Sequence, residues 1–231
     1  MFIVYPIEPQ ARRRYLLSLL QSSKHSTPVS SFHPSCLPHT RRRKLAPTRT
    51  PLSIVPGYTV LVVDTNILLS SLSMLASVIE SLRWTVIIPV PVIMELDGLS
   101  ANTSQLGEAA RAAMSYISSR FKSHSNCLKV QTSKGNYLSS LSIRTEQADF
   151  RDEASWERNM DDLILRAAIW QDEHWVDRSA ILKDEGVTRA TATAIKVVLL
   201  SLDRNLRLKA RSKQLSAASE HDLASILSTG T

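Results

Sequence analysis

The chain has 231 residues, 43% of them hydrophobic, and a formal net charge of +7 at pH 7. This length allows one ordinary domain with a hydrophobic core plus a tail, and no apolar stretch reaches the ~18 residues that a membrane helix needs. The two cysteines, Cys36 and Cys127, lie in unrelated contexts and indicate neither a disulfide framework nor a metal knuckle. We therefore expect a reducing intracellular compartment, the cytoplasm, the nucleus or both.

The positive charge is concentrated in residues 1–56. This segment has nine Lys and Arg against one acid, a net charge of +8, whereas residues 57–231 have nineteen basic residues against twenty acids, a net charge of −1. It also holds eight of the ten prolines, so it buries too little apolar surface to offset its ordering entropy. We predict a disordered basic tail over 1–56, with an organelle transit peptide as the alternative, and a folded domain over 57–231.

Strand and helix patterns alternate through the predicted domain. Aliphatic runs predict strands at 60–63, 85–88, 127–131, 195–201 and 215–218. Apolar residues at helical spacing predict helices at 67–82, 93–99, 106–121, 161–171 and 222–227, and a further helix from 205. Polar stretches at 132–152 and 172–194 predict surface loops. This alternation predicts a three-layer α/β/α sandwich with a mainly parallel central sheet.

Local signals also predict where some elements begin and end. Asn66 or Thr65 is expected to cap the first helix, because both side chains are good N-cap groups. Pro89 lacks a backbone donor, so the second strand is expected to stop at Ile88. Gly98 is expected to end the helix over 93–99.

Acidic residues occur where the predicted strands end and helices begin. Asp64 and Asp203 each follow a buried strand, and Glu95 comes soon after a third. Asp161 and Asp162 open a helix. Because parallel sheets place ligand sites at the carboxyl ends of their strands, we expect these acids to converge at one edge.

A cluster of carboxylates needs compensation. At ~4 Å two of them repel by several kcal/mol at surface dielectric, so the cluster must bind a cation or hold protons. Oxygen ligands with no His or Cys nearby favour Mg²⁺ or Mn²⁺. A carboxylate-held metal pair suits in-line hydrolysis of a phosphodiester.

Each acid also has an ordinary structural interpretation. Asp64 is a reasonable N-cap and Glu95 a reasonable solvated side chain. One of Asp161 and Asp162 complements the helix dipole, and Asp203 has neighbouring arginines to pair with. Glycine-rich phosphate loops, Gly-x-Ser-x-Gly and His-Glu-x-x-His are absent from the sequence. The ordered set of acids therefore carries the functional prediction.

Four stretches present the acids in a recognisable order: 63–66, 92–99, 159–165 and 200–205. They resemble a PIN domain over about residues 58–228. Within that superfamily the chain resembles the endonuclease of nonsense-mediated mRNA decay, which is related to the telomerase-binding Est1 proteins. The narrower resemblance is carried by 95–99, 128–136 and 203–210.

The resemblance implies a metal-dependent endoribonuclease that cleaves single-stranded RNA without reading its sequence, using Mg²⁺ or Mn²⁺ and working with other mRNA-decay factors. The residues it implies are Asp64, Glu95, Asp161 and Asp203 as catalytic acids, with Asp162 as the alternative to Asp161 among the metal ligands, and Asn66 and Ser201 in support. Asp161 is favoured because Ile164 completes the family's Asp-x-x-Ile pattern. Ser201 stands where the family has Thr, and Leu202 stands where close relatives have an acid.

A basic run follows the last acid of the set. Arg204, Arg207 and Lys209 are candidates for binding backbone phosphates, and a solvated helix face is the alternative. A catalytically inactive PIN module that binds proteins is the alternative function, against which the retained acids argue. A structure-specific DNA nuclease is a third hypothesis, although no helical arch or duplex-binding motif is evident.

Overall fold

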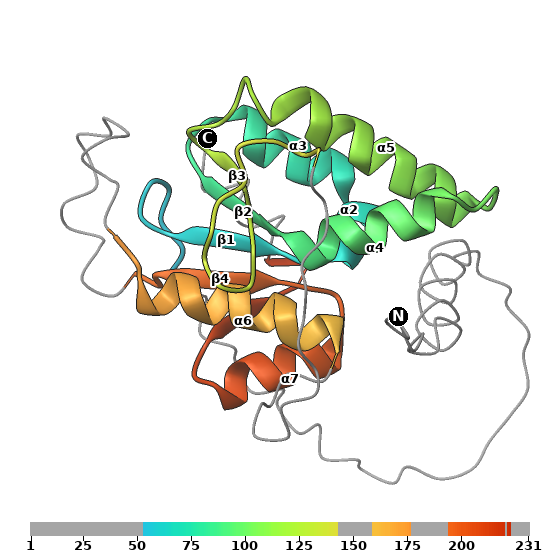
Figure 1. The fold of residues 1–231 in the computed structure, drawn as a ribbon. Coiled ribbons are helices and arrows are strands. Elements are labelled where there is room, and N and C mark those ends of the chain that lie inside the picture. Colours follow the sequence, from blue (N-terminus) through green and yellow to red (C-terminus); the bar gives the residue numbers. More distant parts are fainter. Residues whose placement is uncertain (1–52, 143–158, 177–193, 220, 223–231) are drawn as a thin grey trace, which may run out of the picture. The chain divides into compact units, whose positions relative to one another are not determined.

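The computed structural model of the protein describes residues 53–142, 159–176, 194–219 and 221–222. In these ranges five strands form one parallel sheet in the order β3-β2-β1-β4-β5 (Figure 1). The strands are β1 (Val60–Val63), β2 (Thr85–Pro89), β3 (Leu128–Gln131), β4 (Val197–Leu200) and β5 (Ser216–Ala218). All pairings between neighbouring strands are parallel, so the predicted α/β fold with a parallel central sheet is confirmed.

The helices divide between the two faces of the sheet. They are α2 (Thr65–Ser70), α3 (Leu72–Glu80), α4 (Val90–Ser100), α5 (Gln105–Arg120), α6 (Met160–Glu173) and α7 (Arg204–Ser212). In Figure 1, α3 and α5 lie on one side of the sheet, and α6 and α7 lie on the other. In the sheet, β1 is central: β2 and then β3 lie on one side of it, and β4 and then β5 lie on the other.

The predicted bounds and the predicted N-cap of the first helix are both wrong. The helix expected over 67–82 is two helices, because Ser71 leaves helical geometry with a φ of −131° between α2 and α3. The N-cap of α2 is Asp64 rather than Thr65 or Asn66, and its side chain accepts the hydrogen bond from the Thr65 amide. An aspartate is as good an N-cap as an asparagine, so local propensity could not decide between them.

The prolines and the glycine around α4 also act differently from expectation. Pro89 belongs to β2, and α4 begins at once with Pro91 near its N-terminus. The first turn of a helix has no intrahelical partner for its amides, so Pro91 costs nothing there. Helix α4 continues through Gly98 to Ser100, and nothing crowds Gly98.

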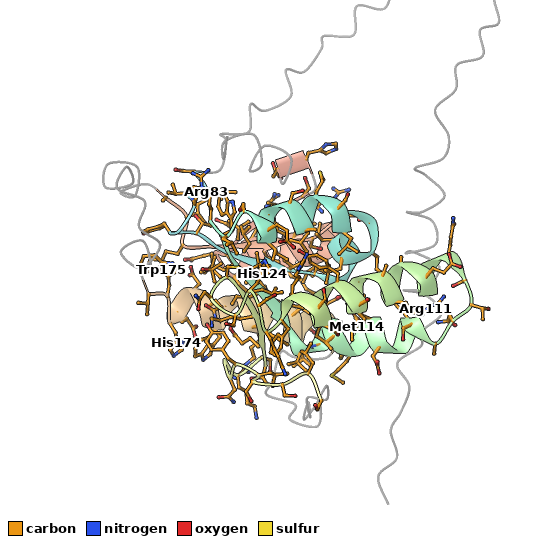
Figure 2. All side chains as sticks on the ribbon, turned by 90° about the horizontal axis from the view of Figure 1, so that it is seen from above. Arg83, Arg111, Met114, His124, His174 and Trp175 are labelled. Carbon is orange, nitrogen blue, oxygen red and sulfur yellow. The ribbon has the colours of Figure 1, made fainter. Side chains whose placement is uncertain are left out.

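The core lies on both faces of the sheet. Every residue of β1, β2 and β4 is buried, as the continuous aliphatic runs predict for central parallel strands. Helix α5 buries the predicted face, with Leu106, Ala110 and Ile117 all inaccessible or nearly so. Met114, further along α5, is buried, whereas Figure 2 shows Arg111 on the part of the α4–α5 pair that extends beyond the packed body. There Arg111 donates to the Ser100 and Asn102 carbonyls at 2.7 and 2.8 Å and so caps α4.

Some predictions fall on residues outside the described ranges. These are the tail apart from residues 53–56, the parts 143–152 and 177–193 of the two predicted loops, and nearly all of the helix at 222–227. The domain boundary at residues 56 and 57 stays a prediction. In the described part of the chain, no helix has the length and apolar character that crossing a membrane requires.

Candidate active site

The strand order reverses between β1 and β4, and two of the predicted acids lie at this point of the sheet. Asp64 follows β1 and Asp203 follows its neighbour β4, with Val63 of β1 in register with Leu200 of β4. In doubly wound sheets this switch point opens a crevice at the carboxyl ends of the strands, where ligands bind. We call Asp64, Glu95, Asp161, Asp162 and Asp203 the acidic edge.

Asp64 is the most deeply buried member of the acidic edge, with a relative exposure of 0%. One carboxylate oxygen accepts the Thr65 amide at 2.7 Å. The other accepts the Asn66 side-chain amide at 2.6 Å and the Ser201 hydroxyl at 2.7 Å. These three donors fix the position and orientation of the buried carboxylate.

Ser201 and Asn66 join the ends of β1 and β4. The Ser201 hydroxyl, which donates to Asp64, also accepts the Asp203 amide at 2.9 Å. The Asn66 carbonyl oxygen accepts the Leu202 amide at 2.8 Å. Both residues were expected in supporting roles, and the bonds they make hold the segment carrying Asp203 against Asp64.

Asp203 serves as the N-cap of α7. One of its carboxylate oxygens accepts the amides of Asn205 and Leu206 at 2.7 and 3.3 Å. The side chain is half-buried, and its second oxygen is not used in capping. The Asp203 backbone amide, rather than its carboxylate, is linked to Asp64 through the Ser201 hydroxyl.

Glu95 reaches the same place from α4. The Thr65 hydroxyl donates to a carboxylate oxygen of Glu95, while the Thr65 amide donates to Asp64. One residue thus orients both acids. Thr65 was predicted only as a possible helix cap. Its position between Asp64 and Asn66 in the sequence is what could have indicated a role in orienting the acids.

The two acids of α6 have different surroundings. Asp162 is 4% exposed and forms an ion pair with Lys209 of α7, with 2.5 Å between the Lys209 Nζ and the carboxylate oxygen. Its backbone amide donates to the Asn159 side chain, which caps α6. Asp161 is half-buried. The pair with Lys209 commits the Asp162 carboxylate to holding α6 against α7.

Two of the three cations predicted to bind phosphate take part in contacts within the fold. Lys209 pairs with Asp162, and the Arg207 guanidinium donates to the Ser201 carbonyl at 2.6 Å. Arg204 is exposed at the start of α7. Sequence reasoning missed these internal contacts because their partners, Ser201 after β4 and Asp162 in α6, lie outside α7.

The donor chemistry of the acidic edge fits a hard divalent cation, since its groups are carboxylate, amide and hydroxyl oxygens. Across the described ranges, however, no three Asp, Glu, His or Cys side chains come close enough together to hold a metal ion. The ligand set of Asp64, Asp161 or Asp162, and Asp203 stays a prediction.

Removing the Lys209 charge is expected to destabilise the fold. Lys209→Met leaves the buried Asp162 carboxylate without this cation, and because Lys209 is itself 45% exposed we expect a loss of roughly 1–3 kcal/mol, less than for a fully buried pair. Urea unfolding measures it, and Lys209→Arg should be nearly neutral. If Lys209→Met and Asp162→Asn prove additive in the double variant, the pair does not contribute.

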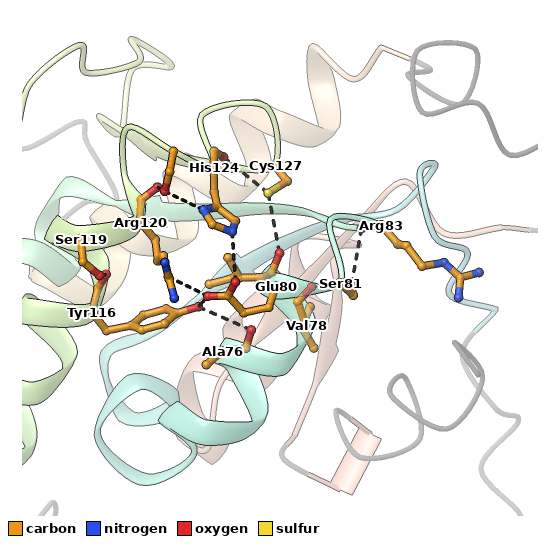
Figure 3. Close-up of polar contacts among 12 residues, drawn as sticks. Ala76, Val78, Glu80, Ser81, Arg83, Tyr116, Ser119, Arg120, His124 and Cys127 are labelled. Carbon is orange, nitrogen blue, oxygen red and sulfur yellow. Dashed lines mark hydrogen bonds and ion pairs between the residues drawn. The ribbon is translucent and has the colours of Figure 1, made fainter.

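A second polar network lies at the opposite edge of the sheet, where α3 and α5 end (Figure 3). Glu80 accepts hydrogen bonds or ion pairs from Arg120 at 2.7 Å, His124 at 3.2 Å and Tyr116 at 3.2 Å. Burial acts to raise the pKa of Glu80, but the Tyr116 hydrogen bond and the charges of Arg120 and His124 lower it below its usual value. This network ties two helix ends together, far from the switch point.

Because of Tyr116, the free energy of unfolding is expected to depend on pH in the alkaline range. Burial, together with the Glu80 carboxylate that accepts its hydrogen bond, raises the pKa of Tyr116 from 10.0 to about 12. The folded state therefore holds this proton more tightly than the unfolded state, so the contribution is complete below pH 10 and is lost as pH rises to 12. Urea unfolding across that window should show stability falling with pH, and falling less in Tyr116→Phe. Equal slopes would contradict the prediction.

A doubly wound parallel sheet, with acids following the strands β1 and β4 on either side of its switch point, defines the class of the domain as α/β. The chain belongs to the PIN domain family, whose model matches residues 61–221.

Two relatives match most of the chain. It is 30% identical over 176 residues to the "Telomerase-binding protein EST1A" of Danio rerio, covering 71% of this chain and 11% of that protein. It is 31% identical over 229 residues to the "Transcriptional protein swt1" of Schizosaccharomyces pombe, covering 95% of this chain and 41% of that protein. The chain thus spans less than half the length of either relative. Among solved structures it is similar to the T. brucei RRP44 PIN domain, with a TM-score of 0.38 and 17% identity over 77% of this chain and 86% of that one.

Proposed function

We propose that the chain is a metal-dependent endoribonuclease that hydrolyses phosphodiester bonds of single-stranded RNA, in nonsense-mediated mRNA decay or a related RNA-surveillance process in the cytoplasm or nucleus. The observation that carries the proposal is the fully buried Asp64 carboxylate, which the Ser201 hydroxyl joins to the backbone amide of Asp203 at the switch point of the sheet. Burying a carboxylate costs free energy that hydrogen bonds or a cation must offset, and ionisable groups buried in a ligand crevice are concentrated at functional sites.

The residues divide the work as follows. Asp64, Asp203 and Asp161 would hold the ion, and Asp162 is the less suitable ligand because it pairs with Lys209. When bound, Mg²⁺ or Mn²⁺ supplies Lewis acidity at the phosphate and lowers the pKa of a bound water. Glu95 is oriented by the Thr65 hydroxyl and is the candidate for accepting a proton from water. Asn66 and Ser201 keep Asp64 in position.

Family membership supports a nucleic-acid substrate, since PIN domains commonly are nucleases. The names of the two relatives refer to telomerase binding and to transcription, and both processes handle nucleic acid. RNA as the substrate, decay factors as partners and Mg²⁺ or Mn²⁺ as cofactor are our proposals for this chain.

The test is cleavage of an end-labelled single-stranded RNA by the purified full chain. We expect internal cleavage with Mn²⁺, none with excess EDTA, and much slower cleavage of a single-stranded DNA of the same sequence. Circular dichroism before and after EDTA checks that the fold survives. Folded protein that leaves the RNA intact with Mn²⁺ would exclude the nuclease, whereas faster cleavage of DNA would favour a DNA nuclease.

The alternative, an inactive PIN module that binds proteins, is favoured by Leu202. This residue lies between Ser201 and Asp203, at a position where we expect an acid in close relatives. In addition, no three of the described acids lie close enough together to hold a metal ion. Under this alternative the chain binds decay factors without cleaving RNA.

Restoring an acid beside Asp203 is expected to raise activity. Leu202 is half-buried and its amide is held by Asn66, so Leu202→Asp adds a carboxylate on a fixed backbone. We expect Mn²⁺ to saturate at lower concentration and cleavage to rise severalfold, about 1 kcal/mol in the barrier. Leu202→Asn is the control of equal size without the charge. Equal rates for the two variants would show that no metal position is missing.

A further inference from the structure

A cavity of about 430 Å³ lies between α6 and the end of α7. We call it the α6–α7 cavity, and among the described residues its lining is Arg166, Ile169, Trp170, Glu173 and Lys213. The four from α6 share one helix face, because they are spaced by three and four residues. The volume is in the range of sites for small organic ligands.

The cavity begins about one helical turn beyond the acidic edge along α6. Helices α6 and α7 both begin at the carboxyl ends of the strands and run toward the opposite edge. Arg166 lies one turn beyond Asp162, and Lys213 lies one turn beyond Lys209, which pairs with Asp162. At 1.5 Å per residue the cavity begins ~8 Å from Asp161.

The lining combines positive charge with a fixed aromatic ring. Arg166 and Lys213 are exposed cations, and Ile169 adds apolar surface. The Trp170 indole lies against Gly135 and stacks on the His174 ring, with centroids 4.2 Å apart and planes 9° apart. Glu173 lies ~10 Å beyond Arg166 along the helix, so the positive end of the cavity is the end nearer the acids.

We propose that the α6–α7 cavity binds a nucleotide of the RNA strand that lies a few nucleotides from the cleaved bond. Arg166 and Lys213 contact its backbone phosphate, and Ile169 and Trp170 contact its base. The distance to the acidic edge corresponds to roughly two to four nucleotides at the 3.4 Å spacing of a stacked strand. Contacts of this kind fix the strand and its register without reading sequence. The proposal rests on the proposed function, because it names where that substrate lies.

The experiment measures RNA binding by the full chain in EDTA, so that no cleavage occurs. The probe is a fluorescein-labelled oligouridine, and anisotropy gives the Kd over a range of salt concentrations. Lys213→Gln and Arg166→Gln should each weaken binding about three- to tenfold at low salt and lower the slope of log K against log salt by ~0.7, one phosphate contact on a single strand. Lys122→Gln removes an equally exposed charge near the end of α5 and should change the Kd less than twofold.

Lysine acetylation followed by mass spectrometry gives a second readout, which does not depend on binding by the basic tail. RNA should protect Lys213 and leave Lys122 as reactive as before. If the chain cleaves RNA but both cavity variants behave like Lys122→Gln and Lys213 is not protected, the cavity proposal is wrong and the proposed function stands. If the folded chain neither binds nor cleaves RNA, the proposed function is wrong, and the cavity proposal with it.

Discussion

Replacing Asp203 by Asn is expected to reduce Mn²⁺-dependent RNA cleavage about a hundredfold or more while leaving the stability of the fold nearly unchanged. The cap of α7 uses one oxygen of Asp203, which accepts the Asn205 and Leu206 amides, and an asparagine carbonyl can accept the same two bonds. Only the charge is lost. A metal ligand contributes several kcal/mol to the transition state, and each 1.36 kcal/mol is tenfold in rate.

The matched variant is Asp64→Asn, which should lose activity and stability together. Its amide nitrogen would take the place of the oxygen that accepts hydrogen bonds from Asn66 and Ser201, so donors would face donors in a buried site. Such a mismatch costs roughly 1–3 kcal/mol. Cleavage rates and urea unfolding of both variants separate the two effects. Full activity of Asp203→Asn would remove Asp203 from the catalytic set.

Gly135→Ala is expected to destabilise the protein by roughly 2–4 kcal/mol. Gly135 has a φ of +91°, which a residue with a Cβ adopts only with strain, and an added Cβ would lie 2.0 Å from the Trp170 ring. Relief requires moving Trp170 and the His174 ring stacked on it. The measurement is the free energy of unfolding in urea.

Gly98→Ala is the matched control, since it makes the same chemical change at an exposed site in α4 where nothing lies within 4 Å. Alanine favours a helix over glycine by up to about 1 kcal/mol, so this variant should be slightly more stable than the parent. Equal effects at the two positions would mean that Gly135 does not lie against Trp170. Because Trp170 lines the α6–α7 cavity, Gly135→Ala should also weaken RNA binding if the cavity proposal holds.

Much of the fold follows from local patterns. The aliphatic run Val60–Val63 can only be buried in the middle of a sheet, and the run at β4 has the same character, so the two central strands were predictable. The ends of helices were harder. Ser71 interrupts a continuous apolar pattern, and Pro91 stands where a helix start and a strand end look alike.

For the candidate site, the sequence by itself determined which acids stand at strand ends and helix starts, and the order of those acids indicated the family. Only the tertiary structure decided the state of each side chain. Ser201, which follows β4 and donates to Asp64, is 137 residues away from it, and Lys209 lies 47 residues from Asp162. Arg207 and Lys209 were predicted to bind backbone phosphates, with a solvated helix face as the alternative, yet both hold parts of the fold together. Periodicity and propensity report neighbours a few residues apart, whereas these contacts depend on which strands and helices meet in space.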